Sequence, residues 1–120
     1  MKTPRHPTVV RRSRDSRLGQ LGKVEPFAAG CLVLVNVRCG RKGCHCATGE
    51  GHPSNYLSYK QGGKTVMRYV PKDRLDEVRK WVSEHKRLKR LTREISDLTL
   101  ELLAAEAYVR RQQRRRQRRS

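Results

Sequence analysis

The stretch "NYLSYKQGGKTVMRYVPKDRLDEVRKWV" (residues 55–82) contains a predicted β-hairpin and the start of a predicted helix. Two segments rich in β-branched and aromatic residues flank Gly62-Gly63, a strong signal for a two-residue hairpin turn. Pro71 ends the strand pattern, and the acidic residues that follow it suit the first turns of a helix. This step from hairpin to helix indicates an α+β fold.

The expected register of the hairpin places Tyr56 opposite Tyr69 and Tyr59 opposite Val66. Together with Arg68, these tyrosines have the side chains needed to stack on nucleic-acid bases. The alternative, which we prefer, is that they pack across the strands beneath the helix.

A further strand is expected upstream, over "CLVLVNVR" (residues 31–38). Its residues are apolar or β-branched on both alternating faces, as in a strand that is covered on both sides. Cys31 is then most simply a small buried hydrophobic residue. With the hairpin, this strand would form a small antiparallel β-sheet.

From about residue 72 the sequence predicts one long helix, since neither Gly nor Pro occurs between Pro71 and the end of the chain. About 45 helical residues would extend for about 70 Å. Large aliphatic side chains recur along it with alternating spacings of three and four residues, which is the a/d seam of a coiled coil. The seam residues are Leu88, Leu91, Ile95, Leu98 and Leu102.

The apolar residues that precede the seam lie off its register, and we expect Leu75, Val78 and Val82 to face the sheet. A helix of this length cannot bury its seam on a head of about 50 residues. Pairing of two chains into a homodimer is therefore the economical prediction. The alternative is a frayed monomeric helix.

The formal net charge of +18 is concentrated at the two ends of the chain. Residues 1–23 carry seven Lys or Arg and one acid, and residues 110–120 carry seven arginines and no acid. Because Pro and Gly interrupt the first segment, we expect it to be flexible. The predicted parts are a flexible basic N-terminal arm (1–23), a small β head with a Cys/His loop (24–71), a long amphipathic helix (72–109) and an Arg-rich tail (110–120).

So basic a chain attracts polyanions, and nucleic acid is the commonest such partner. Solvated tails that bind nothing are the alternative for both ends. The longest apolar run, residues 27–37, is too short to cross a bilayer, and the first basic residues are not followed by the apolar segment of a secretory signal. We expect a cytoplasmic protein with no membrane partner.

The stretch "CGRKGCHCATGEGH" (residues 39–52) contains three cysteines and two histidines. Its spacing, C-x4-C-x-C-x5-H, suits tetrahedral zinc on a loop that glycines allow to fold back. In an extended segment Cys44 and Cys46 point to the same side, so His45 points away and His52 is the better fourth ligand. The expected ligands of a structural zinc ion are Cys39, Cys44, Cys46 and His52. Free or redox-active thiols are the alternative.

We expect neither enzymatic activity nor a small-molecule substrate. Three thiolates and one imidazole would fill the zinc coordination shell and leave no open position for a reacting water. The sequence contains no Ser/His/Asp set or carboxylate pair whose spacing suggests catalysis elsewhere.

The segments "CGRKGCHCATGEGHPSNYLSYKQGGKTVMRYVPKDRLDEVRKWV" (residues 39–82) and "LTREISDLTLELL" (residues 91–103) resemble an uncharacterised family of small basic bacterial proteins, a domain of unknown function. The shared pattern is a CGxxxCxCxxGxxH motif, a Tyr-rich hairpin with a Gly-rich turn, a Tyr-Val-Pro step and a long helix. The resemblance implies a bacterial cytosolic or nucleoid location and a link to mobile elements, but no established activity. The Arg-rich tail lies outside the shared pattern.

The sequence thus favours a zinc-stabilised, non-enzymatic nucleic-acid-binding accessory protein, with DNA preferred to RNA. A dimeric protein–protein adaptor and an RNA-binding protein acting through the Arg-rich tail are the alternatives. No predicted helix is identifiable as one that reads bases. The residues expected to contact nucleic acid are Arg11, Arg12, Arg14, Arg17, Arg38, Arg41, Lys42, Arg110, Arg111, Arg114, Arg115, Arg116, Arg118 and Arg119.

Overall fold

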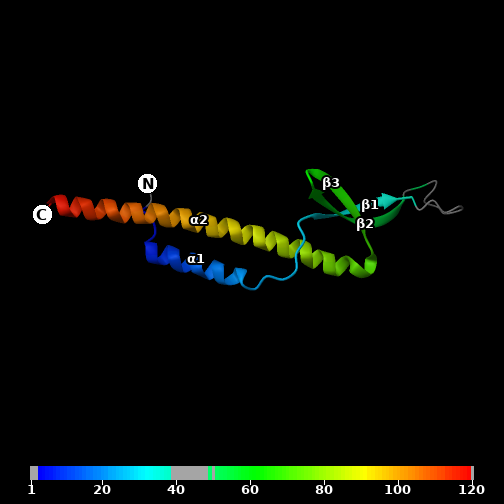
Figure 1. Cartoon of the computed structure of the whole chain (residues 1–120), viewed down its shortest axis with the longest axis horizontal. Coiled ribbons are helices and arrows are strands. Elements are labelled where there is room, and N and C mark those ends of the chain that lie inside the picture. Colours follow the sequence, from blue (N-terminus) through cyan, green and yellow to red (C-terminus); the bar gives the residue numbers. More distant parts are fainter. Residues whose placement is uncertain (1–2, 39–48, 50, 120) are drawn as a thin grey trace. The chain divides into compact units, whose positions relative to one another are not determined.

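The computed structural model describes residues 3–38, 49 and 51–119 of the 120-residue chain. The chain divides into two compact units, which are described in turn. We call residues 25–86 the sheet unit, and residues 1–24 together with 87–120 the helical unit. The long helix α2, Leu75–Arg119, contributes residues to both (Figure 1).

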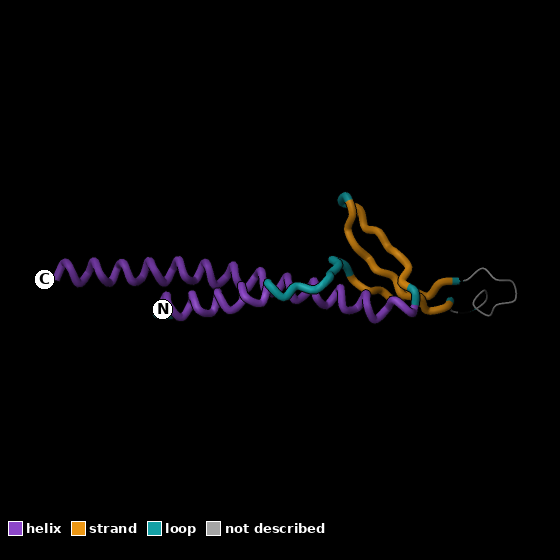
Figure 2. The backbone as a smooth tube through the Cα atoms, turned by 60° about the horizontal axis from the view of Figure 1, so that its bottom comes forward, coloured by secondary structure: helices purple, strands orange, loops and turns teal. Residues whose placement is uncertain are grey.

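The sheet unit contains the predicted small antiparallel sheet, and its three strands lie in the order β1-β2-β3. They are β1 (Cys31–Val37), β2 (His52–Gln61) and β3 (Lys64–Val70), drawn as orange tubes in Figure 2. A short 3-10 turn, Lys72–Arg74, follows β3 and leads directly into α2. The α+β class and the hairpin-to-helix step are therefore confirmed.

The turn between β2 and β3 follows from its two glycines. Gly62 and Gly63 have φ values of 60° and 80°, the left-handed region that a two-residue hairpin turn of this kind needs at both central positions. The turn fixes the expected register, with Tyr56 opposite Tyr69 and Tyr59 opposite Val66.

The core of the sheet unit lies between one face of the sheet and the first turns of α2. Val70 at the end of β3 is buried together with Val78 and Val82 of α2. Partly buried side chains pack against these three: Leu32, Leu57, Leu75 and Trp81. The prediction that the apolar residues before the seam face the sheet is confirmed.

Two expectations about β1 are wrong. Cys31 is exposed rather than buried, and Leu34 is also exposed. Cys31 lies on the face of the sheet opposite the core, whereas Leu34 lies on the core face in one row with Asn55 and Val70. Because β1 is an edge strand, its outer positions are not covered even on the core face.

The N-terminal segment, predicted to be a flexible arm over residues 1–23, is instead largely helical. Helix α1 spans Pro7–Leu21, and Figure 1 shows it beside the middle part of α2. Pro7 occupies the first turn, where its missing N–H costs nothing, and Nδ1 of His6 accepts a hydrogen bond from the Thr8 N–H at 3.2 Å. The composition that suggested flexibility is compatible with a helix because the glycines lie near its end.

The helical unit buries apolar residues from both of its helices. Val10 of α1 is completely buried. On α2 the buried residues are Leu88, Leu91, Leu102 and Ala105. A single straight helix leaves its side chains open to solvent, so another segment must cover these residues. In the helical unit that segment is α1, which covers part of the predicted coiled-coil seam within a single chain.

Candidate nucleic-acid interface

Three arginines of the N-terminal segment form ion pairs with acidic residues of α2. Arg5 makes a bidentate pair with Glu101, with both N–O distances at 2.7 Å. Arg11 meets Glu106 at 2.7 Å, and Arg17 meets Glu94 at 3.4 Å. These guanidinium groups are therefore engaged inside the helical unit.

The Arg5–Glu101 pair also changes the titration of its partners. The hydrogen bonds from Arg5 hold the pKa of the Glu101 carboxyl below its ordinary value, and those to Glu101 raise the pKa of the Arg5 guanidinium. Both side chains are partly exposed, so solvent weakens the pair. The pair links the segment that precedes α1 to α2 within the helical unit.

Two further arginines of α1 were predicted to contact nucleic acid. Arg14 lies 3.3 Å from Asp15 and is partly buried. Arg12 is exposed, and no ion pair is found for it in the part of the chain that the structure describes. Of the predicted N-terminal contacts, Arg12 is the one most open to an external anion.

The seven arginines between positions 110 and 119 are arranged differently. All seven are exposed and belong to α2, so the predicted tail is a continuation of the long helix. Within the described ranges, none of the seven forms an ion pair with an acidic residue. In Figures 1 and 2 this end of α2 extends past the N-terminal end of α1.

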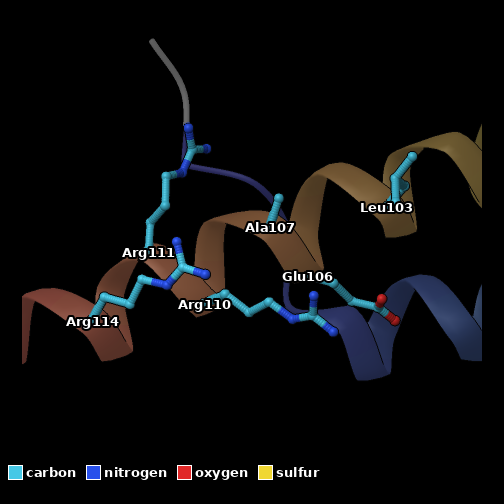
Figure 3. Close-up of a pocket in the computed structure, with 6 residues that line it drawn as sticks. All are labelled: Leu103, Glu106, Ala107, Arg110, Arg111 and Arg114. Atoms are coloured by element: carbon cyan, nitrogen blue, oxygen red, sulfur yellow. The ribbon is translucent and has the colours of Figure 1, made fainter.

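A shallow groove of about 290 Å³ lies where the arginine-rich part of α2 begins. Its lining residues are Leu103, Glu106, Ala107, Arg110, Arg111 and Arg114. Figure 3 shows the three arginines extending from α2 in different directions around its axis. The groove is open and cationic, which suits contact with a polyanion rather than enclosure of a small molecule.

The predicted zinc site lies mostly outside the described residues. Cys39, Cys44 and Cys46 are not among them, nor are Arg41 and Lys42. The described residues contain no group of three or more His, Cys, Asp or Glu that could hold a metal ion. The zinc site therefore stays a prediction.

The structure does place the two ends of the Cys/His segment. His52, the fourth predicted ligand, is the first residue of β2 and pairs with Val37, the last residue of β1. Arg38 follows β1 directly and is exposed. At Gly51 an added Cβ would lie 2.7 Å from the backbone of Val37, so this close approach of the two strands requires glycine.

The predicted dimer seam is partly used inside one chain. Leu88, Leu91 and Leu102 are buried, while Ile95 and Leu98 are partly buried. The reason for expecting a homodimer was that these side chains would otherwise face water. Since α1 covers the three buried leucines within one chain, they do not need a second chain to shield them from water.

Sequence reasoning missed two exposed leucines on the opposite side of α2. Leu100 and Leu103 are 62% and 67% exposed. Both leucines lie off the register of the seam. The a/d spacing places such positions on the solvent-facing side of the helix, so it gives no signal for them.

No helix in the described part of the chain has the length and apolar character that a membrane span requires. Neither curated proteins nor solved structures gave a match to this sequence. The family DUF6788, a domain of unknown function, matches residues 9–80, which is more than half of the chain and includes most of α1, the sheet and the start of α2. The resemblance noted in the sequence is thus confirmed at the level of an uncharacterised family, and the chain belongs to DUF6788.

Proposed function

We propose that this protein is a non-enzymatic nucleic-acid-binding accessory protein of the bacterial cytosol or nucleoid, stabilised by zinc, with DNA as its preferred partner. The observation that carries the proposal is the arginine-rich end of α2, where seven exposed arginines meet no acidic partner among the described residues.

The distribution of acidic residues supports this assignment. Of the four acids of α2 between residues 94 and 106, Glu94, Glu101 and Glu106 are paired with arginines from the N-terminal segment, and Asp97 is exposed. Residues 107–119 contain no Asp or Glu. The positive potential at this end of the helix is thus not neutralised locally, and such a surface attracts phosphates.

Two charge-matched variants test the proposal. Arg110→Gln/Arg114→Gln/Arg115→Gln and Arg5→Gln/Arg11→Gln/Arg17→Gln each remove three positive charges. We expect the first variant to lower the log–log salt slope of binding to duplex DNA by about 2.7, at about 0.9 per lost phosphate contact. The second should change the slope far less, because its guanidinium groups already face carboxylates.

Fluorescence anisotropy with duplex DNA, single strands and structured RNA over a salt series measures these slopes. Circular dichroism of each variant controls for loss of helix. Equal slopes for the wild type and both variants would contradict the proposal. Tighter binding to RNA than to DNA would favour the RNA-binding alternative.

Zinc is the structural part of the proposal, with Cys39, Cys44, Cys46 and His52 as ligands. It is supported by the pairing of Val37 with His52, which brings the ends of the Cys/His segment together. Metal analysis of protein purified without added zinc should show about one zinc per chain. Cys44→Ser should lose that zinc and lower the melting temperature, and full zinc occupancy in a Cys39/Cys44/Cys46 triple Ser variant would contradict the ligand assignment.

A dimeric adaptor is the second candidate function, favoured by the exposure of Leu100 and Leu103. In that case a second copy of the chain would cover these leucines. Sedimentation velocity of the wild type and of Leu103→Asp at tens of micromolar tests for the dimer that the adaptor requires. A dimer that Leu103→Asp converts to monomer supports the adaptor, and a wild-type monomer argues against it.

A further inference from the structure

The arginines at the end of α2 are not spread evenly around the helix. With about 100° between successive residues, six of the seven lie within an arc of about 180°. In order around the arc these are Arg110, Arg114, Arg118, Arg111, Arg115 and Arg119. Arg116 alone lies outside the arc, among the glutamines at positions 112, 113 and 117.

This arginine arc faces away from the side of α2 that meets α1. The buried residues Leu91, Leu102 and Ala105 mark the side covered by α1. Counted at about 100° per residue, the middle of the arc lies on the opposite side, in line with the exposed Leu100. The arc is therefore an open cationic half-cylinder. It begins beside α1, where Arg110 lines a groove with His6 and Pro7, and continues along the end of α2 that extends past α1 in Figures 1 and 2.

The dimensions of this half-cylinder suit one kind of nucleic-acid surface. An α-helix with its side chains is about 10–12 Å across, and the major groove of B-form DNA is about 12 Å wide. Phosphates run along both edges of that groove, so a helix within it needs cations on both flanks. The major groove of A-form RNA is too deep and narrow for the side chains of such a helix to reach the base edges.

We propose that residues 110–119 of α2 lie in the major groove of duplex DNA, which rests on the proposed function and makes it specific. Arg110 and Arg114 on one flank contact the phosphates of one strand. Arg115 and Arg119 on the other flank contact the phosphates of the opposite strand. Arg111 and Arg118 lie between the flanks and face the base edges.

Matched single substitutions separate this arrangement from a flexible polycation. Arg114→Gln and Arg116→Gln remove the same charge two residues apart, one inside the arc and one outside it. We expect Arg114→Gln to lower the log–log salt slope on duplex DNA by about 0.9 and Arg116→Gln to leave it unchanged.

A charge-conserving exchange sharpens the test. The double variant Gln113→Arg/Arg114→Gln keeps the composition and net charge but moves one arginine by about 100°, out of the arc. It should show the same lower slope as Arg114→Gln. A bulky substituent at pyrimidine C5, which fills the major groove, should weaken wild-type binding, whereas a minor-groove ligand should not.

The outcomes distinguish this inference from the proposed function. Wild-type protein that shows no salt-dependent binding to any nucleic acid overturns both. Wild-type binding with equal slopes for Arg114→Gln and Arg116→Gln, or an exchange variant that behaves like wild type, overturns the groove arrangement alone. The same holds if duplex RNA or single strands bind as tightly as duplex DNA.

Discussion

The packing of α1 on α2 can be tested at one buried valine. Val10 is completely buried, while its neighbour Val9 is 46% exposed. Val10→Asp therefore places a carboxylate in an apolar contact, and Val9→Asp adds the same charge on the outside of the same helix. Because both variants add the same side chain to the same helix, the difference in their stability reports the effect of burial alone.

The expected magnitude follows from the burial. Removing a fully buried valine from its contact costs about 1.5–3 kcal/mol, and an unpaired carboxylate adds a further cost of several kcal/mol. A loss above about 3 kcal/mol should lower the melting temperature of a domain of this size by roughly 10 °C or more. If α1 detaches instead, Leu91 and Leu102 become exposed and the chain should self-associate.

Thermal melts by circular dichroism and sedimentation velocity at several concentrations give both quantities. Val9→Asp should melt within about 0.5 kcal/mol of wild type, as surface substitutions usually do. If Val10→Asp and Val9→Asp melt alike and remain in the same oligomeric state, α1 does not pack on α2 through Val10 and the account of the helical unit is wrong.

Two other predictions concern stability. Because the pKa of Glu101 is lowered in the folded chain, the Arg5–Glu101 pair stabilises above the ordinary carboxyl pKa of 4.5 and is lost as the pH falls through the lower, folded-state value. Glu101→Gln should therefore lower the melting temperature at pH 7, and the difference from wild type should shrink on acidification below about pH 4. Gly63→Ala, at a φ of 80°, should destabilise by about 1–2 kcal/mol. Gly19 lies in helix α1, and a Cβ added there would have no atom within 4 Å, so Gly19→Ala should stabilise the protein by about 0.5–1 kcal/mol. Calorimetry measures both glycine variants, and equal effects of the two changes would refute the turn assignment.

The sheet unit was predictable because its signals are local. Gly62-Gly63 fixes the turn, the turn fixes the register, and the register pairs Tyr56 with Tyr69, whose rings meet edge to face at 5.9 Å. The register also fixes the face of the sheet on which each side chain lies. Tyr56 lies one residue from the core residue Leu57 and therefore on the other side of the sheet, so the two tyrosines do not pack beneath the helix as expected.

The helical unit was less predictable because α1 has few apolar residues on its inner face. Pro7 and Val10 are its only buried residues, and the partly buried positions further along include Arg14 and Arg17. Arginine stems cover apolar surface while their charged ends reach water or a carboxylate, and a count of hydrophobic residues does not register them. A basic segment thus resembled a flexible arm although Glu94 and Glu106 provide partners for it.

The extent of the family match bears on where a shared function of the family would lie. The match over residues 9–80 includes most of α1 but ends before Leu88, the first residue of the seam that α1 covers, and before every arginine of the arc. The family match therefore stops short of the surface of α2 that α1 covers and of the arginine arc. We expect properties common to the family to reside in the matched part, which is most of α1, the sheet unit and its Cys/His segment, whereas tight binding to nucleic acid should depend on the arc. A chain that ends at residue 109 separates the two, because it should keep its sheet and any bound zinc while its salt-dependent affinity for duplex DNA falls.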